Sequence, residues 1–357
     1  MKRVLLYGES AKNGTGIARY VQTIAKGIQQ SEPCFDYQVA VRNFHSIPNL
    51  DRIRVAYRTN RLKGKLQHFV RKLTTGDELL FGRSDVVHEP NYNLCKVSRG
   101  TKVILTVHDV GWRIDATPYG LTEQFISEAE QAIKRSSIII TPSQSVKNDL
   151  VRLFGINEDH IHVIYHGVDA FFFQRDTPIA HRAMPERYWL FVGTALSRKN
   201  LERVIGAIAM MHLKLPLILT GERTPYGDHL ARQAKAVGVE VMFFNRASDA
   251  ELRLLYRRST GLIYPSLWEG FGLPLIEAAA AGTIVITSDN TAMKEIAADY
   301  ALLVNPTNVK EIAMAMQYVL EMDQQDRQTR IVKGKEIVKS YTWERSIQSH
   351  IRLYEML

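Results

Sequence analysis

Two glutamates, Glu269 and Glu277, lie on either side of a Gly-Phe-Gly-Leu-Pro segment within SLWEGFGLPLIEAAAAG, residues 266–282. The apolar run before this segment has the length and β-branched content of a buried strand, and Pro274 suits the first position of a helix. A helix start offers unpaired N–H groups and a partial positive charge, which bind phosphate. Because a carboxylate does not bind phosphate, the glutamates are predicted to hold another part of the same ligand.

A second group of charged residues follows a strand-like run in FVGTALSRKNLERV. Gly193 ends the strand, and Arg198 and Lys199 precede Asn200, which is predicted to be the N-cap of the next helix. Cations near a helix start are unfavourable unless an anion lies between them. Solvated surface charge explains the pair in isolation, whereas a shared diphosphate explains it better beside the EGFG helix of the same half.

Histidines end several strand-like runs. His108 and Asp109 end TKVILTVHD, at the edge where ligands of parallel sheets bind, although a lone histidine is more often structural. The same two interpretations hold for His88 with Glu89, and His166 is predicted to be a turn residue. None of these histidines has the spacing of metal ligands, so no metal site is predicted.

A glycine loop follows the first strand-like run, in GESAKNGTGIARY. A dinucleotide-binding fingerprint would need another glycine three residues after Gly16, where Arg19 stands, and the Gly-Lys-Ser/Thr of a P-loop is absent. The residues Gly8, Gly14 and Gly16 therefore indicate a loop that enters a helix N-terminus, either a plain turn or an anion-binding loop.

The elements that must position these residues alternate along the chain. Near-continuous apolar strands separated by amphipathic helices indicate parallel sheets covered on both faces, in two doubly wound domains. We place the domains at residues 1–172 and 173–339, because periodicity is lost over 170–187. The predicted strands are KRVLLYGE, YQVAVRNF, DVVHEP, KVILTVHD, SIIITPS and IHVIYHGVD, then YWLFVGT, LPLILTG, VEVMFFN, TGLIYPS, TIVITSD and ALLVNP. In RASDAELRLLYRR, Ser248 and Glu251 form a predicted capping box at the start of a helix.

Composition narrows the function classes. The chain has 357 residues and a formal net charge of +9, which indicates an acidic partner such as anionic lipid or a phosphorylated substrate. No apolar run is long enough to span a bilayer, and no signal-peptide pattern begins the chain. Cys34 and Cys95 have neither disulfide nor zinc spacing. We therefore expect a cytoplasmic protein.

Part of the positive charge is concentrated in residues 51–72, DRIRVAYRTNRLKGKLQHFVRK, which contain eight Lys or Arg and one Asp. Apolar residues recur there at helical spacing, so a basic amphipathic helix is predicted around Arg58 to Lys72. Contact with an anionic membrane surface and a solvated helix face are equally consistent with this pattern. Nucleic acid is not predicted as a partner, because no recognition motif accompanies the charge.

With these residues in place, the chain resembles the retaining glycosyltransferases of family four along nearly its whole length. The resemblance rests on VGTALSRKNL, LILTGE, TPSQSVKNDLVRLFG with IHVIYHGVD, and above all on PSLWEGFGLPLIE, which contains the E-x7-E signature of that family. It implies the GT-B fold, in which two Rossmann-like domains face each other across a cleft. Residues 340–357 resemble the terminal helix that returns to the first domain in that fold.

The resemblance also implies roles for individual residues. Glu277 would hold the ribose hydroxyls of a nucleotide, Glu269 would face the transferred sugar, and Lys199 would pair with the diphosphate. His108 would line the sugar pocket. The remaining donor-binding residues implied by the resemblance are Arg198, Gly193, Phe271, Gly272, Leu273, Gly14, Gly16 and Arg246.

Two departures from the family pattern alter this assignment. Many members have an arginine where this chain has Thr194, so either Arg198 carries more of the charge or diphosphate binding is weaker. Asn245-Arg246 replaces the usual glycine-aromatic step that contributes to recognition of the base.

The implied activity is transfer of a hexose, mannose favoured, from a GDP- or UDP-linked sugar to a hydroxyl of a lipid-linked or oligosaccharide acceptor in bacterial surface polysaccharide synthesis. Neither a metal nor a cofactor is expected, and the location is the cytoplasm or the inner face of the membrane. The alternatives are a nucleotide-sugar 2-epimerase of the same fold and a non-catalytic partner in glycan assembly.

Overall fold

The computed structural model describes residues 1–8, 10, 16–40, 55–56, 78, 81–174, 184–245, 247–297 and 299–357. These residues form two compact α/β units. The first unit contains residues 1–113, 121–167 and 343–357, and the second contains 114–120 and 168–342. The chain thus enters the second unit briefly at Ile114–Gly120, well before the main crossing at Val168.

The described part of the first unit holds a parallel sheet of seven strands in the order β3-β2-β1-β4-β5-β6-β7. The six strands predicted for this half are all present, and the short β3 is an addition. The strands are β1 (Arg3–Tyr7), β2 (Asp36–Ala40), β3 (Val55–Ala56), β4 (Val86–Glu89), β5 (Lys102–Thr106), β6 (Ile138–Thr141) and β7 (Ile161–Val163). The helices of this unit include α1 (Gly16–Gln30), α4 (Glu123–Arg135), α5 (Gln144–Phe154) and α13 (Trp343–Met356).

The second sheet has the order β10-β9-β8-β11-β12-β13 and is again parallel. Its strands are the six predicted from sequence: β8 (Trp189–Val192), β9 (Leu217–Thr220), β10 (Val241–Phe244), β11 (Gly261–Tyr264), β12 (Val285–Ser288) and β13 (Leu302–Val304). Its helices include α6 (Leu201–Met210), α7 (Pro225–Ala236), α8 (Asp249–Arg258), α9 (Leu273–Ala281), α10 (Thr291–Ala297), α11 (Val309–Glu321) and α12 (Gln324–Val338).

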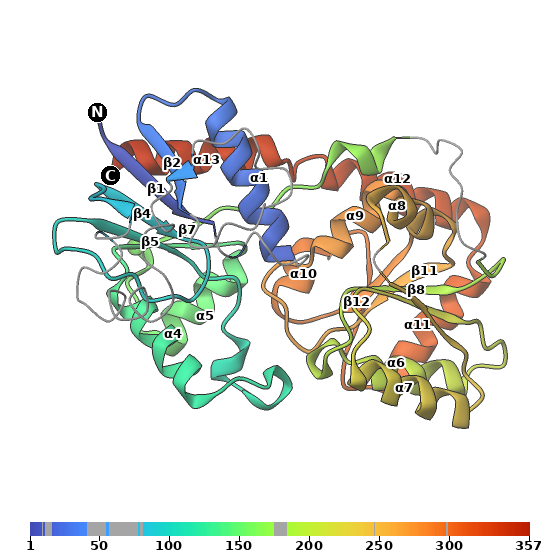
Figure 1. Ribbon diagram of the computed structural model, residues 1–357. Coiled ribbons are helices and arrows are strands. Elements are labelled where there is room, and N and C mark those ends of the chain that lie inside the picture. Colours follow the sequence, from blue (N-terminus) through green and yellow to red (C-terminus); the bar gives the residue numbers. More distant parts are fainter. Residues whose placement is uncertain are drawn as a thin grey trace. The chain divides into compact units, whose positions relative to one another are not determined.

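Burial explains the near-continuous apolar runs of these strands. Every residue of β8, β9, β11 and β12 is buried, because helices cover both faces of the second sheet. In Figure 1, α6, α7 and α11 lie on one face and α8, α9 and α12 on the other. Such a sheet is the doubly wound arrangement that the sequence predicted.

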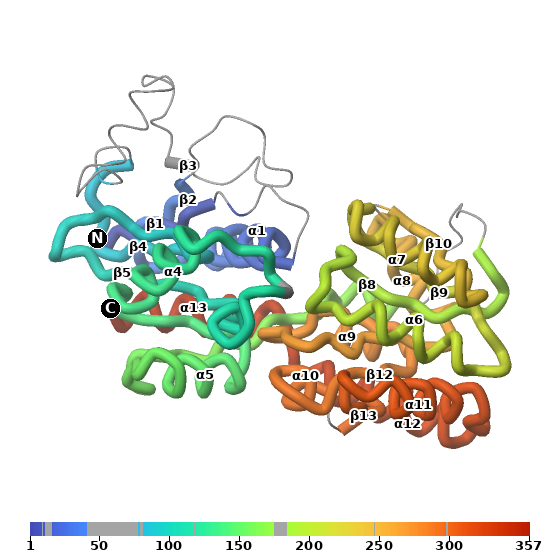
Figure 2. Tube along the Cα trace, turned by 90° about the horizontal axis from the view of Figure 1, so that it is seen from below, coloured from blue at the N-terminus to red at the C-terminus, as the bar shows by residue number. Residues whose placement is uncertain are grey.

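The C-terminal helix α13 belongs to the first unit, as predicted. It packs against α1, although their sequences are more than 300 residues apart (Figures 1 and 2). Gly27 permits this approach, because a Cβ atom at that position would overlap the side chain of Ile347. Where the chain leaves the second unit, Val168 donates its backbone N–H to the carbonyl of Tyr341 over 2.9 Å.

Candidate active site

The strand order of the second sheet places the candidate site. The order reverses between β8 and β11, which are hydrogen-bonded neighbours. Loops that leave the carboxyl ends of two such strands diverge, and ligands of doubly wound sheets bind at this point. Gly193 follows β8 and the Glu269 loop follows β11, so the two predicted charged groups come from neighbouring strand ends.

Gly193 and Gly221 bring backbone close to backbone at this edge. Both have positive φ angles, +125° and +117°. A Cβ atom on Gly221 would lie 2.5 Å from the carbonyl carbon of Gly193, whereas one on Gly193 would meet nothing within 4 Å. Gly221 is therefore required for packing, while Gly193 presents bare backbone to open space.

The cations after β8 are neutralised by the carboxylate after β11. Arg198 and Lys199 lie in a 3-10 turn, η7 (Ser197–Lys199), and both form ion pairs with Oε1 of Glu269. The arginine pair measures 3.0 Å. Lys199 and Glu269 are only 7% and 9% exposed. The anion that the sequence required beside the two cations is thus, in this structure, a carboxylate of the chain itself.

Backbone contacts hold the two loops together around this ion pair. The N–H of Leu267 donates to the carbonyl of Arg198 over 2.8 Å, and the Arg198 guanidinium donates to the carbonyl of Trp268 over 3.0 Å. Tyr264, at the end of β11, donates its hydroxyl to Glu269 over 3.2 Å and accepts from Lys199. Tyr264 was not predicted as a site residue, because a tyrosine in an apolar strand indicates only core packing.

Charge decides the protonation of Glu269. Burial alone would raise the pKa of this carboxyl group, but the positive charges of Arg198 and Lys199 lower its pKa to about 2. Burial raises the pKa of the Tyr264 hydroxyl well above its usual value, and the neighbouring Glu269 carboxylate raises it further. At neutral pH the group therefore combines an ionised carboxylate, two adjacent cations and a neutral phenol.

The EGFGLP segment forms the predicted loop and helix start. Gly272 has a φ angle of +93° and precedes α9, whose first residue is Leu273. Pro274 occupies the second position of the helix, one later than predicted, where its missing N–H is equally harmless. Phe271 is buried and packs edge-on against Tyr341, with 5.9 Å between ring centroids. The start of α9 therefore follows directly on the Glu269 loop.

Glu277 lies one turn into α9 and is only 4% exposed. Its Oε2 atom accepts a 2.9 Å hydrogen bond from the hydroxyl of Tyr256 on α8. This contact orients the carboxylate from a neighbouring helix. Tyr256 was another residue that the sequence did not single out, since its position within α8 gives no sign that it faces Glu277.

Asn200 has the predicted position but a different role. It precedes α6 with a φ angle of +64°, and its side chain makes no capping hydrogen bond. Its Nδ2 atom instead donates to the carbonyls of Pro265 and Pro306, at 2.8 and 2.6 Å. The prediction of side-chain capping was wrong because the residue ties the start of α6 to the ends of β11 and β13. The capping box of Ser248 and Glu251 is confirmed.

One contact of Arg198 comes from the segment Ile114–Gly120, which belongs to the second unit. Tyr119 lies in the 3-10 turn η4 (Thr117–Tyr119), which packs against η7, and its ring centroid is 5.4 Å from the Arg198 guanidinium carbon. This distance is within the range of a cation–π interaction. No sequence pattern indicates this contact, because the two residues belong to different predicted domains.

His108 lies in the first unit, two residues beyond β5. Its Nε2 atom is 2.9 Å from the carbonyl oxygen of Pro90 and must donate to it, because a carbonyl only accepts. Burial lowers the pKa of His108 to about 4, with only partial opposition from this hydrogen bond. The ring is therefore neutral near pH 7, with its proton on Nε2.

His88 belongs to a buried hydrogen-bonded chain in the same unit. Burial lowers the pKa values of His88 and His350, that of His350 to about 4, so both rings are neutral. Nδ1 of His350 donates to the carbonyl of Ser346 over 2.8 Å, so Nε2 must accept from the hydroxyl of Tyr20, also over 2.8 Å.

The direction of the remaining bonds follows from this start. The Tyr20 oxygen accepts from the hydroxyl of Thr106 over 3.0 Å, and Thr106 accepts from Nε2 of His88 over 2.7 Å. Nδ1 of His88 then accepts from the hydroxyl of Tyr354 over 2.5 Å. Because His350 and Tyr354 both lie on α13, this chain attaches the returning helix to α1, β4 and β5, and His88 has a structural role.

The prediction that His166 is a turn residue was incomplete. The side chain is buried, with its ring centroid 4.9 Å from that of Tyr20 and 5.8 Å from that of Trp343.

Among the described residues, no group of three or more potential ligands is placed to hold a metal ion.

Several predictions lie outside the described residues: Gly14, Arg246 and the basic segment from Arg58 to Lys72. Gly16 is described and is the first residue of α1. No helix in the described ranges is both long and apolar enough to cross a membrane.

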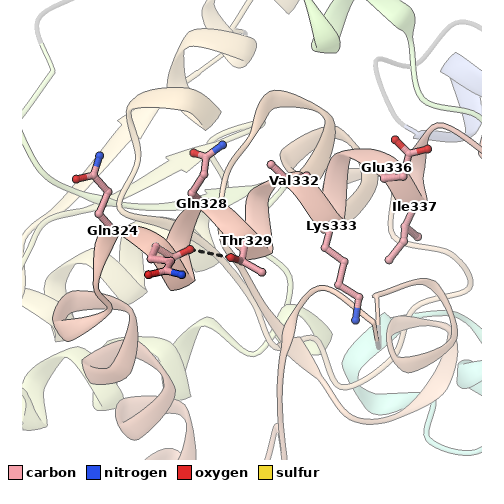
Figure 3. Close-up of a pocket in the computed structure, with 8 residues that line it drawn as sticks. Gln324, Gln328, Thr329, Val332, Lys333, Glu336 and Ile337 are labelled. Carbon is pink, nitrogen blue, oxygen red and sulfur yellow. Dashed lines mark hydrogen bonds between the residues drawn. The ribbon is translucent and has the colours of Figure 1, made fainter.

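A surface pocket lies along α12 (Figure 3). It is lined by residues between Gln324 and Ile337, including Val332 and Lys333, and includes no predicted site residue. The charged group at β8 and β11 therefore remains the candidate site.

Comparison with known proteins identifies the family to which a chain with this fold belongs. Residues 14–170 match the family described as Glycosyltransferase Family 4, and residues 172–336 match Glycosyl transferases group 1. The two matches together span most of the chain, which belongs to this glycosyltransferase family.

Individual relatives share limited sequence identity with the chain. O-antigen chain mannosyltransferase RfbU of Salmonella typhimurium is 30% identical over 61% of each chain. O-antigen chain mannosyltransferase B of Escherichia coli is 25% identical over 96% of each chain. The solved structure of Anabaena HepE in complex with UDP and glucose superimposes with a TM-score of 0.77 at 17% identity, with both chains fully covered, which shows the shared GT-B fold.

Proposed function

We propose that the protein is a retaining hexosyltransferase that transfers a hexose, with mannose favoured, from a nucleoside-diphosphate sugar to a hydroxyl of a lipid-linked glycan. The domain of residues 173–339 binds the donor, and residues 1–172 bind the acceptor. The names of the O-antigen mannosyltransferases support both the sugar and the setting in bacterial surface polysaccharide synthesis.

The observation that carries this proposal is the grouping of Arg198, Lys199 and Glu269 next to the start of α9. In sugar transfer, positive charge develops on the sugar while negative charge develops on the departing diphosphate. Two cations and the N–H groups of Phe271, Gly272 and Leu273 stabilise the diphosphate. The ionised Glu269 faces the sugar, where the opposite charge develops.

Glu277 holds the ribose hydroxyls in this proposal. A carboxylate can accept from two neighbouring hydroxyls, and the hydrogen bond from Tyr256 fixes its orientation. The cations of η7 do the work that a divalent metal does in other transferases, so we propose a metal-independent reaction. Retention follows from attack on the face from which the diphosphate leaves, with a phosphate oxygen of the leaving group taking the acceptor proton.

His108 contacts the transferred sugar in this proposal. Its ring is neutral with the proton on Nε2, which is engaged by Pro90, so it serves through hydrogen bonding and does not donate a proton as an acid. Gly14 and Gly16 complete the donor site, and Arg246 contacts the base.

The basic segment from Arg58 to Lys72 suggests how a cytoplasmic enzyme reaches a lipid-linked acceptor. We propose that it binds the anionic inner face of the membrane. Vesicle flotation tests this step: the protein should float with vesicles that contain anionic lipid and remain behind with neutral ones. Equal behaviour with both would contradict membrane recruitment but leave the transferase proposal standing.

The donor site is tested by thermal unfolding with GDP, UDP, dTDP and ADP, each with and without magnesium. One diphosphate should raise the melting temperature without metal in the wild type and fail to do so in Glu277→Ala. Stabilisation by none of the four would contradict the nucleotide site. The HepE complex makes UDP one serious candidate, whereas the mannosyltransferase relatives leave GDP equally open.

Two other functions share the same fold and give different results with the identified donor. A nucleotide-sugar 2-epimerase would convert the donor without any acceptor. A non-catalytic partner would bind the nucleotide and transfer nothing to any acceptor. The transferase requires both donor and acceptor, so product analysis with each omitted in turn separates the three.

A further inference from the structure

We propose that Tyr119 is a positioning residue for the diphosphate, because it holds the guanidinium of Arg198 at the candidate site. This inference rests on the proposed function and adds to it a residue from the segment Ile114–Gly120. That segment lies between two stretches of the first unit in sequence but belongs to the second unit in the fold.

Local structure makes the position of Tyr119 well defined. Asp115 accepts a hydrogen bond from the backbone N–H of Thr117 over 2.9 Å, which starts the turn. The N–H of Tyr119 donates to the carbonyl of Ala116 over 3.0 Å, and Gly120 ends the turn in the left-handed conformation with a φ angle of +61°. The ring is thus presented by a closed 3-10 turn and not by an extended loop.

The contacts of Arg198 explain what the ring adds. One guanidinium nitrogen, Nη1, donates to both the carbonyl of Trp268 and the carboxylate of Glu269, each at 3.0 Å. The Tyr119 ring, whose centroid is 5.4 Å from the guanidinium carbon, restricts the orientation of the guanidinium plane and adds an attraction to the positive charge.

This restriction matters because recognition of a phosphate by arginine depends on orientation. The planar guanidinium binds phosphate oxygens through two parallel N–H groups, which requires a particular direction of the plane. In the proposed function, Arg198 is one of the two cations beside Glu269 that bind the diphosphate. Loss of the Tyr119 ring should therefore weaken binding of the diphosphate and leave binding of the nucleoside unchanged.

The experiment measures dissociation constants of GDP and UDP and of guanosine and uridine by calorimetry. Tyr119→Leu removes the π face, Tyr119→Phe retains it, and Arg198→Ala removes the partner. We expect Tyr119→Leu to weaken the affinity for the diphosphates about threefold to tenfold. Tyr119→Phe should bind them with an affinity near that of the wild type. The same Tyr119→Leu change in an Arg198→Ala background should have no further effect.

The chain offers a matched control. Tyr318 lies over the guanidinium of Arg330 at 5.7 Å on the outer helices of the same unit. Tyr318→Leu removes a comparable cation–π pair away from the predicted site residues and should leave diphosphate binding unchanged.

Three results would overturn the role of Tyr119: unchanged diphosphate affinity in Tyr119→Leu, an equal loss for the nucleoside, or the same loss in the Arg198→Ala background. Failure of the proposed function is visible separately, since a wild-type protein that binds neither GDP nor UDP would contradict the nucleotide site before any variant is compared, and the role of Tyr119 with it.

Discussion

The ammonium group of Lys199 and the carboxylate of Glu269 form a buried ion pair between residues 70 positions apart in the sequence. The same carboxylate binds Arg198, so one anion neutralises two cations at the edge where β8 and β11 end. A diphosphate that binds these cations must share them with Glu269. The pair therefore links the stability of this unit to the affinity of the site.

Replacement of Glu269 by glutamine should separate these two effects. Removal of one partner of a buried pair leaves the cations uncompensated and lowers stability by about 3 to 5 kcal/mol. Added diphosphate restores a counter-charge, so GDP or UDP should raise the melting temperature of Glu269→Gln more than that of the wild type. Calorimetric unfolding checks both statements.

The control for this variant is Glu336→Gln. Glu336 pairs with Lys339 at 2.6 Å, but both side chains are more than half exposed, so its loss should change little. An unchanged melting temperature for Glu269→Gln, or a smaller ligand shift than in the wild type, would contradict the shared-cation interpretation.

The pKa of Glu269 predicts how stability depends on pH. A carboxyl group whose pKa falls from its ordinary value of 4.5 to about 2 on folding stabilises the folded state above pH 4.5. That contribution, about 3 kcal/mol, is lost as the pH falls from 4.5 towards 2. The difference in unfolding free energy between wild type and Glu269→Gln should therefore shrink over this range, and a difference that stays constant between pH 5 and pH 3 would argue against the ion pair.

The buried hydrogen-bonded chain around Tyr20 should stabilise the first unit. Tyr20→Phe removes the hydroxyl between Thr106 and His350 and should destabilise the unit by about 1 to 3 kcal/mol. The exposed Tyr318→Phe serves as the control. Urea unfolding of the two variants measures the difference, and equal effects would show that the chain contributes little.

The pKa of His350 predicts that the stability of the first unit also depends on pH. Its pKa falls from 6.5 to about 4 on folding, so its neutral form stabilises the protein above pH 6.5, and this contribution is lost as the pH falls towards 4. A plot of stability against pH should accordingly be flatter over this interval in His350→Gln than in the wild type.

Gly221 should be among the least replaceable residues of the second unit. A Cβ atom there would lie 2.5 Å from the backbone of Gly193, and the φ angle of +117° disfavours any side chain. Gly221→Ala should cost more than about 2 kcal/mol and weaken diphosphate binding, because Gly193 must move. Gly155→Ala, with a φ angle of +64° and open space around it, should cost about 1 kcal/mol and leave binding intact. Similar losses in both variants would contradict the close approach at Gly193.

Local signals were sufficient for much of the architecture. Apolar runs predicted all six strands of each set, which are three to five residues long in the structure. The capping box at Ser248 and the glycine before α9 marked helix starts correctly. These features depend on residues within a few positions of one another, through hydrophobic periodicity and the demands of backbone geometry. The E-x7-E spacing likewise lies within one loop and one helix.

Tertiary structure decided the partners of these residues. The sequence placed Lys199 and Glu269 at strand ends, but only the adjacency of β8 and β11 joined them as an ion pair. Asn200 left its expected capping role, and Tyr119 joined a unit other than the one its position predicted. The physical reason is that parallel sheets place distant segments side by side, and the resulting contacts depend on packing geometry that no local pattern records.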